Sequence, residues 1–162
     1  MKEQEIKVLV FRINGEYYAT SILEVERILQ YQKSTKIPDS PRFVEGVINY
    51  EDKILPVISL SKKFNLPSSE IGGESKIIVA KQDHSKIGII VDFVSEVKDV
   101  RLDNIEESPE IISGISKRYI KGLIKNDGRI IIYLNISAIL TEEEKIKIRS
   151  EERRVGKECS QG

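Results

Sequence analysis

The chain has 162 residues, 40% hydrophobic and 32% charged, and its 26 basic and 26 acidic side chains cancel. This length and composition are typical of one globular domain, or of two small halves that share a core, with enough residues for a sizeable core. Zero net charge argues against a nucleic-acid-binding domain, because such domains are usually basic. No run reaches the roughly 18 apolar residues of a membrane span, and MKEQEIKVLVFRI lacks the pattern of an export signal. We therefore expect a cytoplasmic protein without direct membrane insertion.

The first predicted elements are two strands and a short helix. The apolar run at 6–13 ends at the Asn-Gly pair 14–15, a strong β-hairpin signal, and EYYAT begins the returning strand. Apolar residues at 21–29 then recur at helical spacing. Ser21 and Glu24 have the spacing of a capping box, so this stretch is predicted to be a short helix or a helical turn.

Three more hairpins are predicted further along the chain. VINY and KILPVIS flank Glu51-Asp52, KIIVAKQ and KIGIIVDFV flank 83–85, and YIKGLIK and RIIIYLN flank 126–128. Ser59 is positioned to cap a short helix after the first of these. Short strands that come as hairpins at this spacing favour an all-β fold of barrels or sandwiches.

An internal repeat relates the two halves of the chain. Residues 46–64 align without a gap with residues 122–140, each position displaced by 76. Each half is therefore predicted to be a small β-barrel. Pro56 stands opposite Ile132 in this alignment. Because proline lacks the N–H that a ladder needs, Pro56 is predicted at an edge, a bulge or a corner, and an edge is where another chain can dock.

These elements predict one domain, with a tail that lacks apolar periodicity and is of native or vector origin. The predicted parts are a single domain over 1–150, a first barrel over about 14–64 with elements from the chain end, a linker over 65–75, a second barrel over about 76–135, a C-terminal helix over 136–149 and a disordered tail over 151–162.

The sequence lacks the residue sets of catalytic and metal sites. His84 is the only histidine and falls in a predicted turn, and Cys159, the only cysteine, falls in the tail. Metal sites built from these ligands are thus excluded, and no nucleophile elbow or phosphate-binding glycine loop is present. We expect a non-catalytic binding protein that needs no cofactor. An enzyme is disfavoured, and so is a nucleic-acid-binding barrel, which would need interleaved basic and aromatic side chains.

The order of several motifs resembles the CheW-like domain of bacterial chemotaxis coupling proteins, from about Ile6 to about Ile148. LVFRINGEYYATSILEVERI is similar to the family's opening hairpin and corner. IPDSPRFVEGVINYEDKILPVISLSKKF is similar to its most diagnostic segment, and IGIIVDFVSEV to the marker of its second half. The single-domain length resembles the coupling protein itself. The resemblance implies two SH3-like five-stranded β-barrels that share a hydrophobic core, with short helices and a C-terminal helix.

The family's role implies a non-catalytic adaptor. It couples the cytoplasmic tips of methyl-accepting chemoreceptors to the regulatory domain of the histidine kinase CheA, at receptor arrays beneath the inner membrane. A similar scaffold for a non-chemotactic receptor–kinase system is the alternative. In the family, receptor tips dock in the groove between the barrels, and the matching positions are Val25, Gly46 and Val97. Val25 and Val97 could instead belong to the core, and Gly46 could serve only a turn.

The resemblance places the kinase-binding surface on the edge strands of the first barrel, with Ile54 and Pro56 expected to carry it. The family usually has Asn-Leu-Arg-Gly in the neighbouring turn, whereas residues 49–52 here are Asn-Tyr-Glu-Asp. Negative charges at Glu51 and Asp52 thus replace a positive one. Either a partner offers a basic group opposite Glu51, or the tip makes no contact. Without the glycine, Asp52 is expected to adopt a positive φ.

Overall fold

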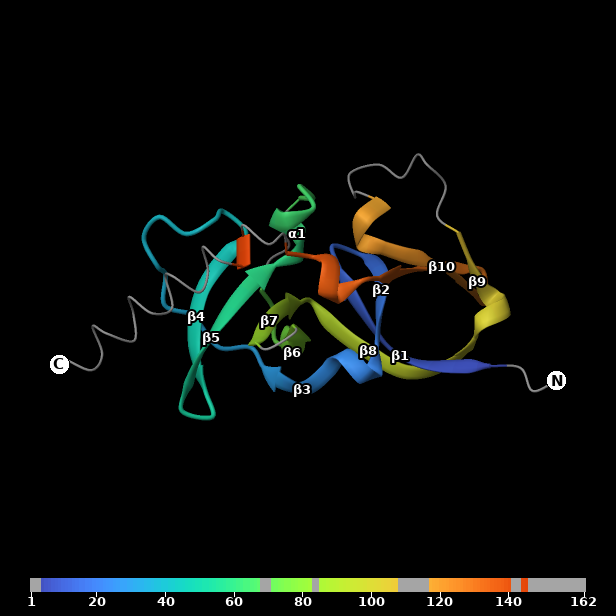
Figure 1. Cartoon of the computed structure of the whole chain (residues 1–162), viewed down its shortest axis with the longest axis horizontal. Helices are drawn as coiled ribbons and strands as arrows, with labels where there is room; N and C mark the ends of the chain where they lie inside the picture. The colour runs from blue at the N-terminus through green and yellow to red at the C-terminus, as the bar shows by residue number, and fades with distance from the viewer. Residues whose placement is uncertain (1–3, 68–70, 83–84, 108–116, 141–143, 146–162) are drawn as a thin grey trace.

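The computed structural model describes residues 4–67, 71–82, 85–107, 117–140 and 144–145. Its strands form two sheets that lie side by side along the long axis of the molecule (Figure 1). In spatial order, the five-stranded sheet contains β3 (Val25–Gln30), β6 (Lys76–Gln82), β7 (Ser85–Val91), β5 (Lys53–Ser59) and β4 (Val44–Tyr50). The six-stranded sheet contains β8 (Phe93–Arg101), β1 (Glu5–Ile13), β2 (Glu16–Ser21), β11 (Arg129–Leu134), β10 (Ile120–Asn126) and β9 (Ile105–Glu106). The predicted all-β fold of two barrel-like subdomains is confirmed.

The tight turns of the hairpins follow from their residues. Asn14 and Gly15 have φ values of 53° and 81°, and Asp127 and Gly128 have 49° and 78°. Positive φ at both central residues gives the turn a twist that matches the strands it joins. Residues 51 and 52 do the same without glycine, with φ values of 51° and 61°. The expected positive φ of Asp52 is confirmed, and Glu51 shares it.

The sequence repeat is also a structural repeat. β4 and β10 begin and end 76 residues apart, and β5 and β11 begin 76 residues apart. Each hairpin has a register shift next to the equivalent glycine, Gly46 or Gly122. Each also continues into a short helix, α1 (Leu60–Lys63) or η4 (Ile136–Ala138). Ser59 Oγ accepts a hydrogen bond from the Lys62 N–H at 3.3 Å, so the predicted cap of α1 is confirmed.

The two halves of the chain exchange a hairpin: β1–β2 lies with β10–β11 in one sheet, and β6–β7 lies with β4–β5 in the other. β3 leaves the hairpin that precedes it and pairs with β6, whereas β8 pairs with β1. One sheet is therefore drawn from residues 25–91 and the other from residues 5–21 and 93–134. The segment 65–75 joins β5 to β6 within one sheet, so it does not separate the two barrels. A turn fixes the partner within a hairpin, but the third strand pairs with whichever sheet edge its side chains can cover.

Both faces of β1 and β6 are buried, which explains their nearly continuous apolar sequences. Alternate side chains point to opposite faces of a strand. Leu9 and Phe11 of β1 lie in a cluster shared by both sheets, while Val8 and Val10 fill the six-stranded barrel. Ile78 and Ala80 of β6 join the shared cluster, and Ile77 and Val79 fill the five-stranded barrel. The shared cluster fixes the two barrels against each other.

Of the short helix or helical turn predicted over 21–29, only a turn forms, and the rest of the stretch is a strand. The structure has one 3-10 turn, η1 (Ile22–Glu24), followed by β3. Ser21 Oγ accepts from the Leu23 N–H at 3.3 Å, and the Glu24 carboxylate accepts from Thr20 Oγ1 instead of closing a capping box. Residues from Val25 onward therefore pair with β6 as a strand, although their apolar spacing favours a helix. Tertiary contacts often override such local helix propensity.

The remaining short elements are η2 (Leu102–Asn104) and η3 (Lys117–Tyr119). Where the C-terminal helix is predicted, the described residues form the 3-10 turn η4, a bend at 139–140 and a helical pair at 144–145. The other half of 136–149 lies outside the described residues, as do His84, Cys159 and the tail. No helix in the described part of the chain is long and apolar enough to span a membrane.

Candidate partner-binding surfaces

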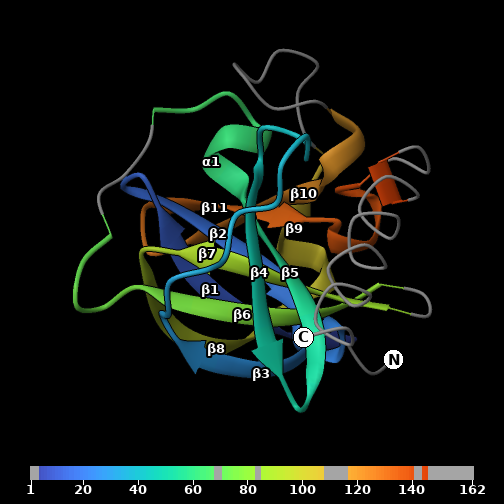
Figure 2. The ribbon, with the colours of Figure 1, turned by 90° about the vertical axis from the view of Figure 1, so that its left-hand side faces the viewer.

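Val25 and Val97 flank the shared core from different sheets. Val25 pairs with Ala80, and Val97 pairs with Leu9. Both partners belong to the shared cluster, and directly paired residues project from the same face of a sheet. β3 and β8 lie on the same side of the molecule in both views (Figures 1 and 2). Val25 is half-buried, whereas the Val97 side chain is 55% exposed.

Leu23 is an exposed apolar side chain beside Val25 that the sequence interpretation missed. It lies in η1, two residues before Val25, and is 82% exposed. An exposed apolar group of this kind marks an interaction site when others adjoin it. The helical interpretation of 21–29 hid Leu23, because it lies outside the apolar stripe of that predicted helix. We call Leu23, Val25 and Val97 the valine surface.

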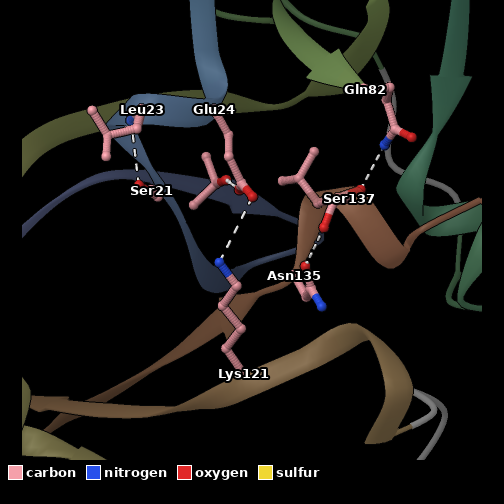
Figure 3. A network of polar contacts seen from close by, with 9 residues as sticks. Ser21, Leu23, Glu24, Gln82, Lys121, Asn135 and Ser137 are labelled. Atoms are coloured by element: carbon pink, nitrogen blue, oxygen red, sulfur yellow. Dashed lines mark hydrogen bonds and ion pairs between the residues drawn. The ribbon is translucent and has the colours of Figure 1, made fainter. Parts of the chain in front are cut away.

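Polar contacts hold η1 in place beside the valine surface (Figure 3). The Glu24 carboxylate accepts from Thr20 Oγ1 at 3.0 Å and lies 3.7 Å from Lys121 Nζ on β10. Nearby, Gln82 Nε2 donates to the Ile136 carbonyl at 2.6 Å, linking β6 to η4. The Glu24 contacts tie η1 to β2 and β10, so they orient the turn that exposes Leu23.

Gly46 lies in β4, at the opposite edge of the five-stranded sheet from Val25. Its φ is 149°, and a Cβ atom there would collide with the carbonyl of Thr35. Thr35 and Val47 exchange two backbone hydrogen bonds of 2.9 Å each. The backbone that approaches Gly46 closely is therefore the segment at Thr35 of the same chain, not a partner. The structure does not place Gly46 with the two valines.

Ile54 is half-buried and lines two surface hollows at the β4–β5 hairpin. Pro56 is buried, so its side chain offers no surface to a partner. The expected edge position of Pro56 is wrong, because β5 lies between β4 and β7. Any contact at this hairpin would fall to Ile54 and its exposed neighbours Asp52 and Lys53.

Hydrogen-bond geometry explains why β5 accepts Pro56. Pro56 pairs with Val47, whose N–H and C=O both bond to Thr35 on the other side of β4. The Val47–Pro56 pair is therefore a non-hydrogen-bonded pair of the antiparallel ladder. The N of Pro56 faces β7, and the ladder with β7 begins only at Val57. The missing N–H of Pro56 therefore costs no hydrogen bond between β4 and β5.

The Glu51–Asp52 tip belongs to a network of charges within the chain. Arg27 Nη1 on β3 lies 3.4 Å from Glu51 Oε1. The Tyr50 hydroxyl donates to Glu26 Oε2 at 2.7 Å, and Lys86 Nζ lies 2.9 Å from Glu26 Oε1. Hydrogen bonds from Lys86 and then Tyr50 lower the pKa of Glu26, while the bond to Glu26 and burial raise the pKa of Tyr50 to about 12. The basic group opposite Glu51 is thus Arg27 of the same chain.

Within the described ranges, no three His, Cys, Asp or Glu side chains lie close enough together to hold a metal ion. The described residues instead present three surface features: the valine surface, the hollows around Ile54 and a charged hairpin tip. Such surfaces can bind other proteins.

Comparison with known proteins gives one consistent family. Residues 7–144 match the family model of the CheW-like domain. The chain is 34% identical to "Chemotaxis protein CheW" of Bacillus subtilis over 137 residues, which cover 85% of this chain and 88% of the relative. It is also 34% identical to the protein of that name from Thermotoga maritima, covering 86% and 90%. The solved structure of the scaffolding protein TtCheW from Thermoanaerobacter tengcongensis superimposes with a TM-score of 0.81 at 31% identity, covering 88% of this chain and 92% of that one.

Proposed function

Because this chain belongs to the CheW-like domain family, we propose that it is a non-catalytic scaffold that couples chemoreceptors to the histidine kinase CheA in bacterial chemotaxis. The observation that carries this proposal is the match over nearly the whole chain, in sequence and in fold, to proteins named for chemotaxis and scaffolding. These names favour chemotaxis over a non-chemotactic receptor–kinase system. The site of action would be the receptor array beneath the inner membrane.

The valine surface is the proposed receptor site. It presents an exposed leucine and an exposed valine next to the shared core, and polar contacts hold its turn. An amphipathic helix can place its apolar face against such a surface. The helical tip of a receptor has that chemistry. Gly46 would support this site only indirectly, because its own surroundings are filled by Thr35.

The hollows around Ile54 are the proposed kinase site. Ile54 lies on the β4–β5 hairpin at the far end of the five-stranded sheet from the other barrel (Figure 1). The hollows combine apolar side chains with Tyr50, Lys53 and Asp52, a mixture found at specific protein interfaces. The regulatory domain of CheA is the proposed occupant. Pro56 would contribute from beneath, by shaping β5.

A binding experiment tests both sites. The chain would be mixed with a receptor cytoplasmic fragment, with the CheA regulatory domain, and with both, and complexes would be measured by pull-down. We expect each partner to be retained and the ternary complex to be the most stable. Failure of the folded chain to bind either partner would refute the coupling role.

Single substitutions separate the two surfaces. Ile54→Lys should weaken kinase retention and leave receptor retention unchanged. Ile130→Lys is the matched control, because Ile130 is the equivalent residue of the other barrel and is 57% exposed. Equal loss of kinase binding in both variants would contradict the Ile54 assignment.

A further inference from the structure

The interior of each barrel ends at a tyrosine ring that two cations contact. In the five-stranded sheet the ring is Tyr50, with Arg27 Cζ and Lys86 Nζ each 5.7 Å from its centroid. In the six-stranded sheet the ring is Tyr17, with Arg12 Cζ at 5.3 Å and Arg129 Cζ at 4.7 Å. Each tyrosine packs with the apolar cluster inside its own barrel. The two ends thus share one construction.

The two ends differ in how their cations are neutralised. At Tyr50, Glu26 pairs with Lys86 and Glu51 pairs with Arg27. At Tyr17, no carboxylate of the described residues forms an ion pair with Arg12 or Arg129, judged by an N–O distance of 4.0 Å or less. Two guanidinium groups therefore lie near one ring, at most about 10 Å apart by their distances to its centroid, without a counter-charge in direct contact.

Arg12 and Arg129 also differ in the hydrogen bonds that their N–H groups form within the chain. Arg129 Nη1 donates to the Tyr17 hydroxyl at 2.8 Å, which orients that guanidinium beside the ring. Arg12 Nε is buried and has no hydrogen-bond partner among the described residues. An unmet buried donor is unfavourable, and a charged one more so. Because Nε is buried, a carboxylate of a partner could reach Arg12 only through its terminal nitrogens.

These groups form a row across four neighbouring strands. Phe93 of β8 pairs with Arg12 of β1, and Arg12 pairs with Tyr17 of β2. Arg129 begins β11, the strand next to β2. Aromatic and guanidinium groups therefore alternate as Phe93, Arg12, Tyr17 and Arg129. Tyrosine and arginine are the side chains that contribute most at protein interfaces. We call these four residues the arginine row.

We propose that the arginine row is a docking surface for an acidic segment of a partner protein, whose carboxylate binds between Arg12 and Arg129 at the edge of Tyr17. Guanidinium groups bind carboxylates through paired, charge-assisted hydrogen bonds. The partner's carboxylate should bind on the side of Arg12 that faces Tyr17 and Arg129. The hollow on the other side of Arg12 is lined by Asp92 and Glu74, whose negative charges would repel it. Asp92 Oδ2 already accepts the Asn14 N–H at 2.8 Å.

The overall charge favours a peptide over a nucleic acid as the occupant. Nucleic-acid binding relies on many cations along a surface, whereas this chain has zero net charge. The arginine row holds only two arginines, next to the carboxylates of Asp92 and Glu74. One or two carboxylates of a protein segment satisfy such a site. This surface is separate from the valine surface and from Ile54, so its test does not depend on receptor or kinase binding.

The test is a fluorescence-anisotropy titration of the full chain with a labelled peptide of alternating Glu and Leu. The matched peptide carries Gln in place of Glu, and a single-stranded oligonucleotide is the competing polyanion. We expect the Glu peptide to bind more tightly than the Gln peptide, and to bind less tightly at higher salt. Arg129→Gln and Arg12→Gln should each weaken binding about tenfold, as expected for loss of a hydrogen bond between charged groups.

Lys125→Gln is the control variant, because Lys125 lies in the same sheet but already pairs with Glu106 at 2.9 Å. Its affinity should stay within about twofold of the parent chain. Arg129→Lys should lose less affinity than Arg129→Gln, because lysine keeps the positive charge but cannot form the paired hydrogen bonds of a guanidinium group. Thermal unfolding would show that each variant folds. Equal affinities for the two peptides, loss in Lys125→Gln but not in Arg129→Gln, or tighter oligonucleotide binding through the same arginines would overturn the proposal.

Discussion

Arg27 and Glu51 form an ion pair between β3 and the β4–β5 turn, with 3.4 Å between Nη1 and Oε1. β3, which carries Arg27, is one outer strand of the five-stranded sheet, and Glu51 lies in the turn that follows β4, the other outer strand. The pair therefore links opposite edges of that sheet. The charge of Glu51 is thereby neutralised within the chain, whereas Asp52 is exposed and forms no ion pair among the described residues. A partner need not supply a basic group opposite Glu51.

Reversing the charges tests this pair. Arg27→Glu or Glu51→Arg alone should lower the free energy of unfolding, because like charges then meet at the tip. The double variant should recover most of the loss. Both side chains are more than half exposed, so the coupling energy should be about 0.2–1 kcal/mol. Urea unfolding of the four proteins measures it, and strictly additive effects would show that the pair contributes nothing.

Stability should depend on pH through Glu26. Its pKa is lowered in the folded chain by the hydrogen bonds from Lys86 and Tyr50. A group with a lowered folded pKa stabilises the protein above its unfolded pKa, about 4.3 for Glu, and loses that contribution as pH falls through the folded pKa. The free-energy difference between the parent chain and Glu26→Gln should therefore be largest near pH 6 and shrink below about pH 4. A constant difference across this range would contradict the assignment.

Tyr50 should give the opposite dependence at high pH. Its pKa is raised to about 12, so its contribution is complete below the unfolded value and is lost as pH rises from about 10 to 12. Tyr50→Phe removes this titration. Chemical denaturation between pH 9 and pH 11.5 should show the parent chain losing stability faster than Tyr50→Phe, and parallel curves would exclude the Tyr50–Glu26 bond as the cause.

Gly46→Ala should destabilise the fold by at least about 2 kcal/mol, since the new Cβ meets the backbone of Thr35 and φ is positive. Gly122→Ala should behave similarly, because its Cβ would lie 2.8 Å from the Glu106 carbonyl oxygen. Gly72→Ala is the control, as nothing lies within 4 Å of its Cβ position. Calorimetric melting compares the three. A melting temperature of Gly46→Ala equal to that of the control would mean that the Thr35 segment moves aside freely.

The two valines should respond differently to a charge. Val97→Asp should weaken receptor binding while changing the free energy of unfolding by less than about 0.5 kcal/mol, because Val97 is exposed. Val25→Asp should also destabilise the chain, because Val25 packs against the shared cluster. Binding and urea unfolding of both variants would be measured in parallel. Intact receptor binding by folded Val97→Asp would remove the valine surface from the receptor site.

Much of this architecture is local and can be predicted from the residues alone. The Asn-Gly, Glu-Asp and Asp-Gly turns, the apolar runs beside them and the cap at Ser59 depend on neighbours within a few positions. The 76-residue repeat predicted two similar halves, and equivalent strands do begin 76 residues apart. The motifs likewise identified the family that the comparisons show. Each of these signals is carried by residues close together in the sequence.

Contacts between distant segments decided the rest. β3 pairs with β6 instead of continuing a helix, and Thr35 fills the space beside Gly46. Pro56 is tolerated in an inner strand because Val47 bonds elsewhere, and Arg27 neutralises Glu51 across the sheet. No local pattern encodes these relations, since each depends on which strand edge or side chain the folded chain brings alongside. The sequence alone thus determined the hairpins, the repeat and the family, whereas the tertiary structure decided which hairpins share a sheet and which residues remain available to partners.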